Sequence, residues 1–192
     1  MTATNPKLLP VSVPWMICPS APFLRVQLTS AGAPASVTFI GFFKCDDMPW
    51  QGQFNQRPEV VRSAPDFEAR PLSEKAPFRM VKIAFLEGRA AKTLPAVADA
   101  EVVREDDYDW SAIPGTRMSG ETVEQNVVRT RELWLHSGVC PDPAMYEVVP
   151  SQWLAEEKLD PSAGWHHYLL LGHDEYVEVI AKGWDWQPGQ PA

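Results

Sequence analysis

The stretch WHHYLLLGHDEYVEVIAKGWDW, residues 165–186, is the element around which we expect the rest of this chain to pack. Its first arm, 165–171, and its second arm, 176–182, are rich in the aromatic and β-branched residues that favour strands. A glycine-led polar segment, 172–175, separates the two arms and is typical of a tight turn. The stretch therefore predicts a β-hairpin.

The register of this hairpin follows from a symmetric turn. It places Leu169 opposite Glu178 and His167 opposite Ile180, so that His167 and Glu178 are diagonal neighbours on one face. The remaining predicted pairs are Leu171 with Tyr176, Leu170 with Val177, Tyr168 with Val179 and His166 with Ala181. Both faces are largely apolar, which predicts that the hairpin lies in the interior of a sheet.

Alternation of apolar and polar residues predicts further strands elsewhere in the chain. They are 23–29, 36–44, 78–87, 96–104 and 145–149. The first two are separated by a turn with Gly32 and Pro34, and this predicts a second hairpin.

One principal helix is predicted over about 120–137. Thr122 and Gln125 have the spacing of a capping box, and Gly138 stands where a C-terminal cap is expected. Its apolar residues recur at helical spacing and predict a buried stripe. They are Val123, Val127, Val128, Trp134 and Leu135. A shorter helical turn is predicted to begin at Ser151.

These elements predict an α+β fold: a mainly antiparallel β-sheet of about five to seven strands, with the principal helix packed on one face. The 192 residues suit a single domain, 1–192. Proline punctuates a predicted irregular N-terminal arm, 1–22, and a long excursion, 45–77. The end of the chain, 187–192, is predicted to be a Pro/Gly tail.

Charge is distributed unevenly along the chain. The half 1–98 has eleven Lys/Arg and seven Asp/Glu, a net charge of +4, whereas 99–192 has six and eighteen, a net charge of −12. This balance disfavours nucleic acid as a partner, because phosphates repel a negative protein. No apolar run approaches the roughly 18 residues of a membrane span. Three cysteines without a pairable spacing and no evident signal peptide predict a cytoplasmic protein.

The histidines of the 165–186 stretch are the first candidates for chemistry. Adjacent strand residues point to opposite faces, so His166 and His167 do not converge on one ion. The diagonal pair His167 and Glu178 is the one that geometry supports, as a carboxylate that orients an imidazole. It is equally a way to satisfy two half-buried polar groups.

Cys140, with His136 four residues before it, is the second catalytic candidate. A cysteine just past a helix C-terminus has its thiol pKa raised by the dipole, which is unfavourable for a nucleophile. The sequence contains no nucleotide-binding, hydrolase or zinc motif of the common kinds. No cofactor and no metal site are predicted.

Acidic and aromatic residues supply the candidates for binding. The acidic segment 105–109 contributes Asp106 and Asp107. The others belong to the hairpin and its flanks: Trp165, His173, Asp174, Glu175, Trp184 and Trp186. Tryptophan packs in cores but is also enriched at interfaces.

The leading functional hypothesis is a non-enzymatic interaction module, inhibitor-like or immunity-like, that recognises a basic protein partner. The alternative is a small enzyme that uses acid/base chemistry at His167 and Glu178. A homo-oligomer subunit is a third class. A concave pocket at His167 would favour the enzyme, and a flat acidic face bearing tryptophans would favour the interaction module.

Overall fold

The computed structural model describes residues 5–18, 24–43, 78–95, 105–172 and 175–188. The predicted excursion 45–77, the predicted strand 96–104 and the candidates His173 and Asp174 lie outside these residues.

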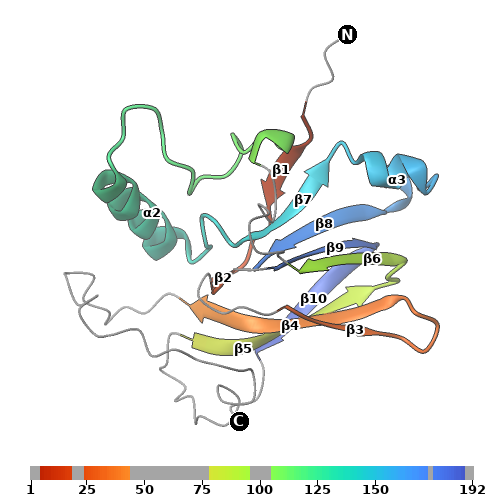
Figure 1. The fold of residues 1–192 in the computed structure, drawn as a ribbon. Coiled ribbons are helices and arrows are strands. Elements are labelled where there is room, and N and C mark those ends of the chain that lie inside the picture. The colour runs from red at the N-terminus through yellow and green to blue at the C-terminus, as the bar shows by residue number, and fades with distance from the viewer. Residues whose placement is uncertain (1–4, 19–23, 44–77, 96–104, 173–174, 189–192) are drawn as a thin grey trace.

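The α+β class is confirmed, and the strands pair antiparallel in two sheets (Figure 1). Sheet A has the order β1 (Lys7–Pro10), β7 (Met145–Val149), β8 (His166–Leu171), β9 (Glu175–Ala181) and β6 (Ala90–Pro95). Sheet B has the order β10 (Gly183–Pro188), β5 (Phe78–Leu86), β4 (Pro34–Phe43) and β2 (Trp15–Ile17), and β3 (Arg25–Leu28) also pairs with β4. The helices are α2 (Val123–Ser137) and α3 (Gln152–Glu156), with 3-10 turns η1 (Glu105–Asp107) and η2 (Pro161–Ala163).

The two sheets face each other across the main hydrophobic core. Inward side chains of sheet A, such as Leu170 and Val179, pack with Phe39 and Ile83 of sheet B, and all four are fully buried. The rings of Phe85 and Tyr168 join the two layers at 6.3 Å. The period-two alternation of each strand accounts for this arrangement, because it gives every strand one apolar inner face.

The C-terminal hairpin forms with the predicted register. Leu169 pairs with Glu178 and His167 with Ile180, and the strands β7 and β6 flank the hairpin on its two sides. Its interior position in sheet A is therefore confirmed. The outer face of this hairpin is covered by α3 at one end and by the segment that contains Tyr108 and Trp110 at the other.

The structure corrects the prediction that 1–22 is irregular and that 187–192 is a tail. Lys7–Pro10 and Trp15–Ile17 form β1 and β2, and Gln187 and Pro188 end β10. The strand β6 also went unpredicted. The strands β1, β2, β6 and β10 all lie at sheet edges. A short edge strand tolerates proline because one side of its backbone has no neighbouring strand to hydrogen-bond with.

The helix α2 has the predicted caps. The Thr122 side chain accepts from the Gln125 amide, the Gln125 side chain accepts from the Thr122 amide, and Gly138 is left-handed at φ 70°. The predicted buried stripe is wrong in part: Trp134 is buried, but Val123 and Val128 are 58% and 55% exposed. The helix thus contacts the body of the protein mainly through one tryptophan. No helix among the described residues combines the length and the apolar character that crossing a bilayer requires.

Candidate functional site: a pocket beneath the principal helix

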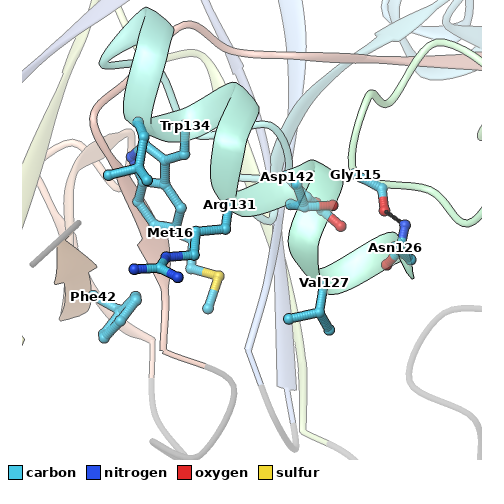
Figure 2. Close-up of a pocket in the computed structure, with 10 residues that line it drawn as sticks. Met16, Phe42, Gly115, Asn126, Val127, Arg131, Trp134 and Asp142 are labelled. Carbon is cyan, nitrogen blue, oxygen red and sulfur yellow. Dashed lines mark hydrogen bonds between the residues drawn. The ribbon is translucent and has the colours of Figure 1, made fainter. Parts of the chain in front are cut away.

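A pocket of about 260 Å³ lies between α2 and the ends of β2 and β4 (Figure 2). An engineered cavity of about 150 Å³ binds benzene, so this volume suits a side chain or a small molecule. Segments far apart in the sequence line it. The lining residues are Met16, Phe42, Gly115, Asn126, Val127, Thr130, Arg131, Trp134, Leu135 and Asp142.

Trp134 fixes the aromatic end of the pocket. Its ring meets Phe42 edge-on at a centroid distance of 5.9 Å, and its Nε1 donates to the Pro14 carbonyl at 3.2 Å. The same buried cluster contains Cys140 and is flanked by Met16. Met16 and Phe42 alternate with inward-facing Trp15 and Phe43, so they point out of the sandwich and toward the helix.

Asp142 supplies a carboxylate at the other end of the pocket (Figure 2). Its Oδ1 accepts from the Tyr146 hydroxyl at 2.5 Å and from the Ala144 amide at 3.4 Å. Burial, and then the Asp142 charge, raise the pKa of Tyr146, so the phenol remains a donor. Gly115 allows the close approach of its loop here, because a Cβ at Gly115 would lie 2.6 Å from the Asp142 Cβ.

Two further polar groups of α2 line the pocket between these ends. The Thr130 Oγ1 is buried and has no hydrogen-bond partner among the described residues. Arg131 is exposed, and Figure 2 shows its guanidinium on the Met16 and Phe42 side, away from Asp142. No ion pair joins Arg131 to Asp142 in the part of the chain that the structure describes.

Arg129 holds the loop that forms the rim of the pocket. Its guanidinium donates to the carbonyls of Pro114 and Thr116 at 2.6 and 3.0 Å and pairs with Glu121 at 2.8 Å. The Arg129 hydrogen bond, followed by one from the Met118 amide, lowers the pKa of Glu121 to about 2. Asn126 adds a bond to the Gly115 carbonyl at 3.1 Å. The rim is therefore built into the structure by specific contacts.

His167 and Glu178 lie on one face of sheet A, as the register requires. Their Nε2 and Oε1 atoms are 3.3 Å apart, but the angle is not that of a hydrogen bond. The Ser151 hydroxyl contacts the His167 Nδ1 at 2.9 Å and also caps α3 by accepting from the Leu154 amide. The Trp153 ring lies edge-on to the imidazole at 5.2 Å.

Burial decides what this second cluster can do. His167 is 5% exposed and its Nε2 is enclosed. Glu178 also lies near Tyr108, whose pKa rises to about 12 through burial first and this carboxylate second. The contacts of His167 therefore join α3 to the sheet, and a substrate would not reach the imidazole without displacing Trp153 or Ser151.

The other catalytic candidates do not converge. Cys140 is buried, and this burial raises the pKa of its thiol to about 12. The direction agrees with the sequence prediction, and burial is the largest cause. His136 is exposed, and its Nδ1 lies 2.8 Å from the Glu132 carbonyl.

The tryptophans proposed for binding are each partly buried against the body of the protein. Trp165 lies in the cluster beneath α3, with the Lys182 ammonium 5.3 Å from its ring centroid. Trp184 packs against the main core. Trp186 meets Trp15 edge-on at 6.0 Å. Glu175, another binding candidate, accepts a hydrogen bond from the Leu24 amide through its side chain.

The acidic candidates are placed differently. Asp106 and Asp107 are exposed on η1, and the Asp106 carbonyl accepts from the Asn5 side chain. No residue of the α2 pocket was predicted from the sequence to contact a ligand, because the pocket residues carry no local signal for binding. The one available signal was the apolar stripe of α2, which was interpreted as core.

Comparisons of the chain with protein-family models, with curated proteins and with solved structures found no match.

Proposed function

We propose that this chain is a non-enzymatic interaction module that recognises a basic protein partner. The observation that carries the proposal is the concentration of negative charge in one stretch of the chain. Residues 105–172 contain twelve Asp/Glu and four Lys/Arg, a net charge of −8. The strands of sheet B contain one acidic and three basic residues.

The exposed acids come from η1, from α3 and the turn after it, and from α2, which packs against β2 and β4. They include Asp106, Asp107, Glu124, Glu132, Glu156, Glu157 and Asp160. Figure 1 shows η1 and α3 beside sheet A, whereas α2 lies near the ends of β2 and β4, where Trp134 contacts Phe42. A cluster of exposed acids attracts a cationic protein and steers its approach.

The alternative, an enzyme with His167 and Glu178 as its acid/base pair, receives less support. Its imidazole is enclosed by Ser151 and Trp153, as described above. A catalytic base must come within hydrogen-bond reach of a substrate proton. We propose the cytoplasm as the compartment, in keeping with the three cysteines of the sequence, which have no pairable spacing. The homo-oligomer hypothesis stays a prediction.

The test is capture of a partner from native lysate, its identification, and titration with the purified protein. We expect a basic protein whose affinity falls as salt rises from 0.1 to 1 M, because the Debye length shrinks from about 10 to about 3 Å. Reversal of Asp106 and Asp107 to lysine should weaken binding, whereas the matched reversal Asp185→Lys in β10 should not. A partner that is not basic, or one indifferent to both changes, would overturn the proposal.

A further inference from the structure

We infer that the pocket beneath α2 receives an arginine side chain of the partner, with its guanidinium on Asp142 and its stem against Trp134. The inference rests on the proposed function and specifies where the partner is anchored. The pocket combines apolar walls with a carboxylate at one end, and a long cationic side chain has the complementary distribution of apolar stem and charged head.

The walls suit the stem. Met16, Val127 and Trp134 present a thioether, a branched aliphatic side chain and an indole along the pocket. Val127 and Leu135 are only half-buried by the protein itself, although they belong to the apolar stripe of α2. An inserted stem would bury this surface and gain about 25 cal/mol for each Å² removed from water.

The polar groups suit the head. Oδ1 of Asp142 is engaged by Tyr146 and Ala144, while Oδ2 has no hydrogen-bond partner among the described residues. The Thr130 hydroxyl is also buried and without a partner there. A guanidinium has five donors in a planar fork, so it can donate to a carboxylate oxygen such as Oδ2 of Asp142. An ammonium has three donors and lacks the planar face that stacks on aromatic rings.

Arg131 gives the inference a sharp test, because it is a cation that lines the same pocket. It must repel an incoming arginine, whereas it would attract an anionic ligand. An arginine occupant therefore predicts opposite signs: Asp142→Asn weakens binding and Arg131→Ala strengthens it. A zwitterion would lose affinity in both variants, and an anion would lose affinity in Arg131→Ala alone.

The probes are blocked tripeptides with a central arginine, citrulline or lysine, titrated into the full chain. Citrulline keeps the shape of arginine without its charge. The readout is the NMR shift of the Trp134 indole N–H, identified by its loss in Trp134→Phe, with the Trp153 indole as internal reference. We expect saturable shifts with arginine, weaker binding with lysine and none with citrulline.

The variants complete the experiment. Asp142→Asn should weaken arginine binding about tenfold, as loss of a charge-assisted hydrogen bond does. Its amide oxygen can still accept from Tyr146, so the fold should persist, and NMR spectra will show this. Arg131→Ala should strengthen binding, and Asp185→Asn should leave it unchanged.

Equal binding of arginine and citrulline, or any other sign pattern in the two pocket variants, would overturn the inference. Absence of a Trp134 shift at millimolar arginine peptide would overturn it as well. Because these probes do not need the natural partner, such a failure is distinct from a failure of the proposed function. A salt-sensitive basic partner that still binds Asp142→Asn at full affinity would leave the function standing and remove only the anchor.

Discussion

At the scale of single residues, Trp134 is the buried residue of α2, where a whole stripe of apolar residues was predicted to be buried. Trp134 is 9% exposed, contacts Phe42 and Cys140, and donates to the Pro14 carbonyl. Its neighbours on the predicted stripe are half-buried or exposed. The cost of truncation along α2 should therefore differ strongly from position to position.

We predict that Trp134→Ala lowers the free energy of unfolding by about 3–5 kcal/mol, because a large buried side chain leaves a cavity. Val128→Ala, which removes a side chain from a 55% exposed residue, should change it by less than about 0.5 kcal/mol. Val127→Ala should lie between them. Urea denaturation measures all three, and equal midpoints for Trp134→Ala and wild type would show that the helix is not anchored there.

At the scale of elements, the loop before α2 is tied to the helix by a charged clamp. Arg129 reaches the carbonyls of Pro114 and Thr116 and pairs with Glu121. The pKa of Glu121 falls from its usual value near 4.5 to about 2. A carboxyl with a lowered folded-state pKa stabilises the fold fully above its unfolded value, and this stabilisation is lost as pH falls through the folded value.

The clamp therefore predicts a pH window. The difference in unfolding free energy between wild type and Glu121→Gln should be constant from pH 7 to about 5, shrink between pH 4.5 and 2, and vanish below. Urea denaturation across this range measures it. Glu132→Gln, at an exposed acid of the same helix, is the control for general acid effects. A difference that persists unchanged at pH 2 would mean that the Glu121 charge is not what Arg129 recognises.

At the scale of the whole molecule, the N-terminal strand β1 forms one edge of sheet A. The strand β1 pairs with β7, 136 residues or more further along, and buries Leu8 completely while Leu9 is 37% exposed. The same strand bridges to Asp109, and Lys7 pairs with that carboxylate at 3.5 Å. An N-terminal arm that packs in this way is part of the folding unit.

We predict that Leu8→Ala lowers the free energy of unfolding by about 2–5 kcal/mol, whereas the adjacent Leu9→Ala has an effect below about 1 kcal/mol. The two variants delete the same atoms from neighbouring positions and differ only in which face of β1 they alter. Thermal and urea denaturation measure the contrast. Similar costs for both would contradict the pairing of β1 with sheet A.

The elements that depend on residues close together in the chain could be predicted from the sequence alone. The hairpin of β8 and β9 formed in the predicted register because aromatic and β-branched arms meet across a short turn. The caps of α2 at Thr122 and Gly138 were predictable because they depend on residues within four positions. The placement of His167 beside Glu178 followed from the same register.

The layering of these elements and the position of the pocket depend on contacts between distant segments, and the tertiary structure was needed to see them. Asp142 lies between Pro141 and Pro143, and no local pattern marks it as a pocket residue. Backbone bonds between Cys140 and Val13 and between Gly115 and Pro141 place its segment beside β2 and the loop before α2. For the same reason, the apolar stripe of α2 lines a pocket instead of packing in a core. Contacts between residues more than a hundred positions apart depend on the packing of whole layers, which no local pattern encodes.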